Sequence, residues 1–315
     1  MKAAHKSFDK IIHAAQRYVP QITSMEEIAS GSNNVFKLID EHDKKYLFKE
    51  YINRGTHSDS EPELYKLLKN PDFLRKQIAV DSSKENYPEK FGLYEYIDGI
   101  TLFDIIRDDK LVNYNIAEIV KQVITIIRYF TEIPAEGFGK VDLIEEVFGD
   151  TKDWIKFLTL YHESSIDRIK LKHPSIAEEA SKLLKQIPSI IGKDEILPVI
   201  IPCDLNTKNI LITQDNKLFL LSGAIMAADE GYGFTQFLSH LYKTPLADEM
   251  IKQLKVDKDQ LQKLHLYCSI SNYNVMAFVS EYTDLNPESS IPWGNSHSFS
   301  ELLGEHMTAI GDSFL

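Results

Sequence analysis

The sequence predicts an α+β fold in which a strand-rich first third precedes a helix-rich remainder. Apolar runs over residues 35–39 and 46–51, separated by a polar turn, are typical of a hairpin. Farther along, apolar residues recur every three or four positions, as between Ile116 and Phe130, which indicates buried helices. A strand that ends at Asp98-Gly99 separates the two patterns, so we predict two lobes, residues 1–97 and 98–315.

Composition restricts the class of protein. The chain has 315 residues, of which 43% are hydrophobic and 26% charged, as in ordinary globular proteins. A formal net charge of −12 argues against a nucleic-acid partner. Two cysteines exclude a disulfide framework and favour a reducing, cytoplasmic compartment. No apolar run approaches the ~20 residues of a membrane span, and residues 1–20 fit an amphipathic helix better than a signal peptide.

The first hairpin contains two features that suit phosphate binding. Small residues, Ser30-Gly31-Ser32-Asn33, precede its first strand, and such a tip can offer backbone N–H groups to phosphates. Lys49 lies on the returning strand between apolar neighbours, where it points either into a cleft or into solvent. A plain hairpin with a solvated lysine is the alternative interpretation of both features.

A helix start follows the hairpin. Ser60 and Glu63 have the spacing of a capping box, and Pro62 lies in the first turn. We expect either Glu61 or Glu63 to pair with Lys49 and the other to interact with the helix dipole. A second capping box is predicted at Ser175 and Glu178.

The most informative segment spans residues 199–212. An apolar run leads to Asp204, a short polar turn follows, and Asn209 precedes a second apolar run, Ile210–Ile212. This strand–loop–strand pattern suits kinase chemistry, in which an aspartate accepts the proton of the attacking hydroxyl and an asparagine holds a magnesium ion. A simple polar turn between two buried strands is the alternative, because Asp and Asn are common turn residues.

The remaining segments complete the prediction. A strand from Lys217 ends in Ser222-Gly223, and residues 227–234 are predicted to form a mobile acidic loop. Helices are expected over 237–241, 248–254, 261–278 and 301–310. The acidic stretch 142–146 either attracts an amine-bearing acceptor or forms a solvated helix face.

In order, these pieces resemble the aminoglycoside phosphotransferase and choline kinase family, which has a bilobal protein-kinase-like fold. Glu95-Tyr96-Ile97-Asp98-Gly99 looks like the linker between its lobes, and 204–211 is similar to its catalytic loop. The chain departs from the family in two places. Pro202 stands where a histidine is usual, and Ser222 stands where an aspartate binds the metal.

The resemblance implies an ATP-dependent phosphotransferase that acts on a hydroxyl of a small molecule, with ATP and Mg²⁺ as cofactors. By this resemblance, Asp204 is the catalytic base, and Asn209 and Ser222 are the metal ligands. The phosphates are contacted by Lys49, whose partner is Glu61, and by the tip Ser30, Gly31, Ser32 and Asn33. Glu95 and Tyr96 contact the adenine. Because serine supplies no charge to a metal, a catalytically impaired pseudokinase-like binding module is the alternative. Asp229 or Glu230 is the candidate substitute for the missing carboxylate.

Overall fold

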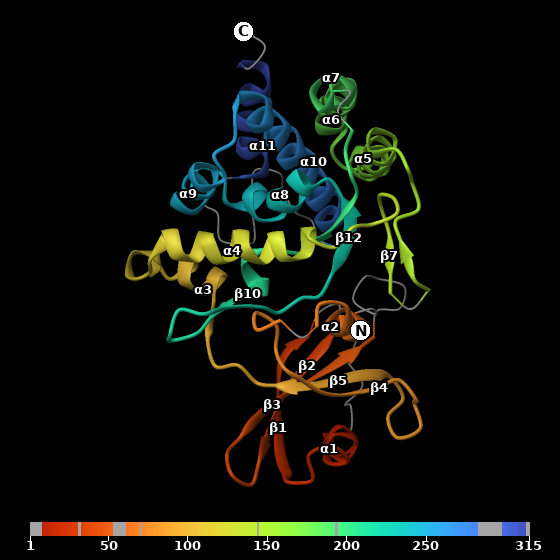
Figure 1. Ribbon diagram of the computed structural model, residues 1–315, viewed down its shortest axis with the longest axis vertical. Coiled ribbons are helices and arrows are strands. Elements are labelled where there is room, and N and C mark those ends of the chain that lie inside the picture. The colour runs from red at the N-terminus through yellow and green to blue at the C-terminus, as the bar shows by residue number, and fades with distance from the viewer. Residues whose placement is uncertain are drawn as a thin grey trace. The chain divides into compact units, whose positions relative to one another are not determined.

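The structure is a computed structural model that describes residues 8–30, 33–52, 61–69, 71–143, 145–192, 195–282 and 298–312. The chain divides into two compact units (Figure 1). The first comprises Met1–Gly99 together with Phe219–Ala224, and the second comprises Ile100–Leu218 and Ile225–Leu315. The segment that carries Ser222 therefore returns to the first unit. The division at residues 97 and 98 stays a prediction of functional lobes.

The first unit is built on a five-stranded antiparallel sheet in the order β1-β2-β3-β5-β4. Its elements are α1 (Phe8–Gln16), β1 (Ile22–Ser30), β2 (Asn34–Asp40), β3 (Lys45–Tyr51), α2 (Glu61–Leu67), β4 (Gln77–Asp81) and β5 (Lys90–Glu95). The predicted hairpin is confirmed as β2 and β3, with Val35 opposite Lys49. Residues predicted as a tip belong partly to β1, whose last residue is Ser30.

Alternation along β3 directs its side chains to two different faces. Phe48 packs with Ile11 of α1 and with Phe36 and Phe91 in one apolar core. Lys49 points to the other face, where it contacts Glu61 of α2. Because side chains alternate along a strand, one face holds the core of this unit and the other presents the lysine.

The second unit is helical and contains short paired strands. Its helices are α3 (Leu102–Arg107), α4 (Ile116–Thr131), α5 (Trp154–Lys170), α6 (Pro174–Leu184), α7 (Ile187–Ile191), α8 (Glu230–Leu241), α9 (Pro245–Leu254), α10 (Lys258–Tyr282) and α11 (Phe299–Asp312). Its paired strands are β6 (Ile100–Thr101) with β10 (Ile210–Ile212), β7 (Val141–Asp142) with β8 (Val147–Phe148), and β9 (Val199–Pro202) with β12 (Ile225–Ala228). Strand β11 (Leu218–Leu220) crosses the division between the units.

Helix α10 organises the second unit by packing against α5, α7, α8 and α11 (Figure 1). The apolar core there includes Trp154, Tyr232, Tyr267 and Tyr273. In the described part of the chain, none of the helices has both the length and the apolar character needed to cross a bilayer. The predicted α+β fold class, strand-rich at first and helical afterwards, is confirmed.

Two local predictions were wrong. Residues 227–234 form no loop: β12 ends at Ala228, and Asp229 caps helix α8 by accepting a bond from Gly231 N. The capping box at Ser175 is also absent, because α6 already begins at Pro174, and His173, its N-cap residue, makes no side-chain cap bond. Proline at the first helical position sets the start two residues earlier than the predicted box. The box predicted at Ser60 lies outside the described residues.

Four histidines of the second unit are almost completely enclosed: His162, His240, His265 and His306. Burial lowers the pKa of His162, His240 and His265 to about 4 and that of His306 to about 3. A histidine whose pKa is lower in the folded than in the unfolded state binds a proton on unfolding at intermediate pH. These groups therefore make the folded state less stable as the pH falls from about 6.5 towards 4.

We expect the His162→Phe variant to lose free energy of unfolding less steeply between pH 6.5 and pH 4 than the parent. Phenylalanine preserves the ring contact with Tyr273, whose centroid lies 5.3 Å away, but binds no proton. Denaturant titrations across this pH range measure the slope. The exposed His42, changed to Gln, is the control and should leave the slope unchanged. Identical slopes for His162→Phe and the parent would contradict the prediction.

Candidate functional site

The first unit contains a buried ion pair between strand β3 and helix α2. Lys49 Nζ contacts the carboxylate of Glu61, and the two side chains are only 8% and 4% exposed. Glu63, from the same helical turn, instead binds Lys90 at 3.2 Å. Of the two acids considered from the sequence, Glu61 is the one that lies against Lys49.

Three tyrosines surround this ion pair. The ring centroid of Tyr51 lies 5.4 Å from Lys49 Nζ, and its hydroxyl lies 2.6 Å from that of Tyr94. Tyr65 packs on Tyr94 with ring centroids 5.4 Å apart. Burial, followed by the negative charge of Glu61, raises the pKa of all three hydroxyls. The three buried hydroxyls thus stay neutral.

The segment that carries Ser222 is held to the first unit by two hydrogen bonds. Leu220 N donates to Phe73 O at 2.9 Å, and Arg75 Nη2 donates to Leu221 O at 3.0 Å. Gly223 follows directly and lies against Glu61. The structure therefore places Ser222 in the same unit as the Lys49–Glu61 pair.

The second unit contains the loop predicted to be catalytic. Asn206 Nδ2 donates to Asp204 Oδ1 at 2.6 Å, and Asn209 Nδ2 donates to the Asp204 carbonyl at 2.9 Å. Asn206 Oδ1 also accepts from Lys208 N at 3.0 Å, which caps the short 3₁₀ helix Thr207–Asn209. One asparagine thus orients the carboxylate and starts the helical turn that carries Asn209.

Sequence reasoning missed Asn206 and the three tyrosines. Asn two residues after Asp204, just before a short helical turn, is the pattern of an N-cap and was available in the sequence. The tyrosines had a weaker signal, because alternation places Tyr51 on the Lys49 face but does not show which strand or helix covers it.

The thiol of Cys203 lies next to Asp204 in the chain. Burial, reinforced by the negative charge of Asp204, raises its pKa well above the ordinary value. A thiol of raised pKa is a poor nucleophile, because the thiolate is the reactive form. Cys203 is therefore a poor candidate for a nucleophile.

The residues predicted to contact adenine border a hollow of about 480 Å³ in the first unit. Glu95 and Tyr96 line it together with Asp43, Lys44, Lys45 and Asp98. The Tyr96 ring has Lys37 Nζ at 5.8 Å and Lys45 Nζ at 5.7 Å from its centroid. Of the predicted phosphate tip, Asn33 is buried, and Gly31 and Ser32 lie outside the described residues.

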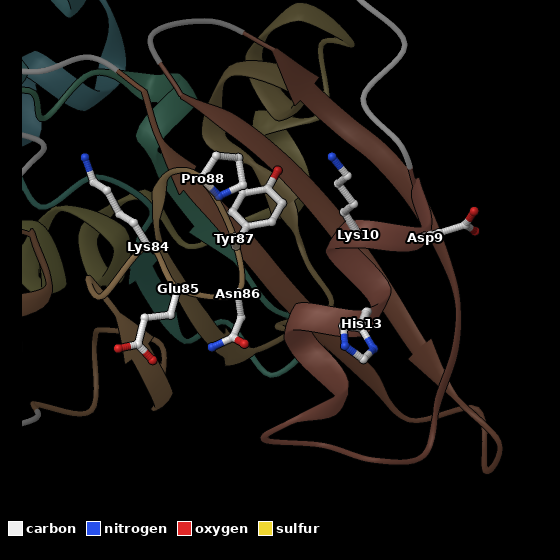
Figure 2. Close-up of a pocket in the computed structure, with 8 residues that line it drawn as sticks. All are labelled: Asp9, Lys10, His13, Lys84, Glu85, Asn86, Tyr87 and Pro88. Carbon is white, nitrogen blue, oxygen red and sulfur yellow. The ribbon is translucent and has the colours of Figure 1, made fainter.

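A second hollow of about 460 Å³ is also found in the first unit, between α1 and the connection that precedes β5 (Figure 2). Figure 2 shows Asp9, Lys10 and His13 on the helix and residues 84–88 on the connection. Its lining mixes both signs of charge and includes no residue predicted to be functional. This hollow is therefore not part of the candidate site.

The proposed substitution of Asp229 or Glu230 for the missing metal ligand does not fit the structure. Asp229 is buried, and its carboxylate binds Lys263 Nζ at 2.6 Å, Gly231 N at 2.6 Å and Tyr267 Oη at 3.1 Å. These contacts hold it at the start of α8. Glu230 is exposed on that helix.

The remaining donors fit a magnesium ion poorly. Asn209 offers one neutral amide oxygen and Ser222 one neutral hydroxyl, whereas magnesium sites usually contain one or two carboxylates. Throughout the described ranges, no three His, Cys, Asp or Glu side chains are grouped so that they could hold a metal ion. Two neutral donors such as these would bind magnesium weakly.

Comparison with known proteins supports the fold assignment. No family model matches the chain, and no curated protein matches it by sequence. Solved structures do match. An aminoglycoside phosphotransferase APH(4)-Ia variant, in ternary complex with AMP-PNP and hygromycin B, is 12% identical with a TM-score of 0.65, over 97% of this chain and 99% of that one. The chain has the fold of small-molecule kinases.

A second match supports the same assignment. The choline kinase LicA from Streptococcus pneumoniae is 14% identical, with a TM-score of 0.59 over 96% of this chain and 99% of that one. The expected protein-kinase-like fold is thus confirmed. Identities this low establish the fold alone.

The buried ion pair yields a stability prediction. Lys49→Met leaves the Glu61 carboxylate buried without a cation, and we expect a loss of about 3–5 kcal/mol in the free energy of unfolding. Lys49→Met combined with Glu61→Leu should lose less, because both charges are removed. Denaturant titration measures both variants.

The matched control is Lys90→Met, which breaks the more exposed Lys90–Glu63 pair between β5 and the same helix. Its expected loss is about 1 kcal/mol or less. If Lys49→Met were no more harmful than Lys90→Met, the ion pair would not be a buried one in solution.

Proposed function

We propose that the chain is an ATP-dependent phosphotransferase that transfers the γ-phosphate to a hydroxyl of a small molecule. The observation that carries this proposal is the buried Lys49–Glu61 pair. In kinases, this ion pair fixes the lysine that contacts the nucleotide phosphates.

The catalytic loop has a defined place in this proposal. Asp204 accepts the proton of the attacking hydroxyl, and its carboxylate is oriented by Asn206. Positioning of this kind provides much of the rate in phosphoryl transfer. Residues 1–97 form the nucleotide-binding lobe, with Ser30–Asn33 over the phosphates and Glu95–Tyr96 beside the adenine. Residues 98–315 bind the acceptor.

The nature of the partners follows from the same proposal. The chain binds a nucleotide, with ATP as the donor, and a small hydroxyl-bearing acceptor. Hygromycin B, present in the APH(4)-Ia complex, and choline, implied by the name of LicA, are two acceptors to test. The compartment is cytoplasmic, and no nucleic acid or membrane takes part.

The Asp204→Asn variant tests the proposed base. We expect ADP formation from ATP, with hygromycin B or choline as acceptor, to fall by about 10²–10⁴-fold, because the amide accepts no proton. Nucleotide affinity, measured by calorimetry, should stay close to that of the parent. Asp215→Asn changes a nearby surface carboxylate bonded to Thr213 and should leave the rate unchanged. A parental rate in Asp204→Asn would refute the assignment.

A second candidate function, a nucleotide-binding module without phosphoryl transfer, is favoured by two observations. Ser222 provides no carboxylate, and the contacts of Asp229 hold it elsewhere. In such a module the Lys49–Glu61 pair still receives phosphates, but the metal that would neutralise their charge is bound weakly or not at all. ATP then binds with little dependence on magnesium.

Melting with ATP, with and without magnesium, separates the two functions, because a ligand that binds the folded state raises the melting temperature. If ATP raises the melting temperature of the parent only when magnesium is present, the enzyme is favoured. If ATP raises it equally with and without magnesium, the binding module is favoured. We expect Ser222→Asp to make the rise more magnesium-dependent, with Ser222→Ala as its control. No gain in Ser222→Asp would show that position 222 does not face the metal.

A further inference from the structure

Gly223 is enclosed by helix α2 although nothing in its backbone conformation requires glycine. The residues of the described chain with positive φ do not include it. A Cβ atom at this position would lie 2.5 Å from Glu61 Cγ, 3.2 Å from Glu61 Cβ and 3.2 Å from Leu64 Cδ2. Glycine is therefore required here because a larger side chain would clash with Glu61 and Leu64, and not because of its backbone conformation.

The neighbouring atoms cannot easily move away. Glu61 Cγ lies in the middle of a side chain whose carboxylate is bound to Lys49. Leu64 lies three residues later on the same helical face and is fully buried. On the other side, the backbone of residues 220–221 is tied to Phe73 and Arg75. A side chain at position 223 must therefore displace either the first turn of α2 or the Glu61 side chain.

We propose that Gly223 is a positioning residue, which lets the returning segment brace Glu61 so that its carboxylate reaches Lys49. Segment 219–224 would then hold the phosphate-binding lysine in place indirectly, by packing against Glu61. The family resemblance instead predicts a charged metal ligand at position 222, next to Gly223. The consequence for nucleotide binding rests on the proposed function. The steric coupling between Gly223 and Glu61 does not.

A double-mutant cycle tests the coupling. Gly223→Ala in the parent chain should lower the midpoint of denaturant unfolding and weaken binding of ADP about tenfold. Glu61→Ala removes Cγ, so Gly223→Ala should lower the midpoint much less in that background. Glu61→Gln keeps Cγ and removes only the charge, so Gly223→Ala should remain as harmful to stability there as in the parent.

Gly304→Ala is the matched control, because a Cβ at Gly304 on helix α11 would meet no atom within 4 Å. It should lower neither the midpoint nor ADP affinity. The stability measurements test the steric coupling between Gly223 and Glu61, and the ADP affinities test its effect on nucleotide binding. Additive stability losses for Gly223→Ala and Glu61→Ala would overturn it outright.

The ADP affinities test whether Gly223 has a positioning role. Coupled stability losses with unchanged ADP affinity in Gly223→Ala would reduce Gly223 to a packing residue and overturn its positioning role. If the parent bound no ADP, the proposed function would fail, and the stability cycle alone would still uphold or refute the bracing of Glu61.

Discussion

The buried ion pair between Lys49 and Glu61 is the constraint on which the first unit depends. Removing two charges from water is costly, and the attraction between them compensates only if the geometry is maintained. Here the strand, the first turn of α2, three tyrosines and the returning segment all contribute to that geometry. A chain that needed only a stable sheet would be served as well by an apolar pair. Charges at this position suit the proposed function, in which the lysine contacts phosphates.

In the second unit, the loop over residues 204–209 is held by short-range hydrogen bonds. Asp204, Asn206 and Asn209 are held by contacts that span at most five residues. Its 3₁₀ turn also packs against α3 and β6, and the flanking strands β9 and β10 are contiguous with the loop in sequence. This explains why its elements were readable from the sequence, since both the strand boundaries and the turn residues are local signals.

What the sequence could not reveal depends on packing between distant segments. Periodicity predicted the hairpin and α4, because each pattern is contained in one window of sequence. The acidic-looking stretch after Ala228 was misinterpreted because Asp229 is neutralised by Lys263, more than thirty residues later. The return of residues 219–224 to the first unit was equally invisible. Nothing in that segment indicates that its partners are Phe73, Arg75 and Glu61.

The effect of having serine instead of aspartate at position 222 depends on the charges around it. Lys49 and Glu61 already balance one another, so the pair needs no further ion to be stable. An aspartate at 222, on the segment that packs against Glu61, would add a second negative charge and with it a demand for a compensating cation beyond the Lys49–Glu61 pair. Serine removes that demand. The Lys49–Glu61 pair is thereby balanced without a further charge, so in the proposed function Lys49 can contact a phosphate while Glu61 holds it in place.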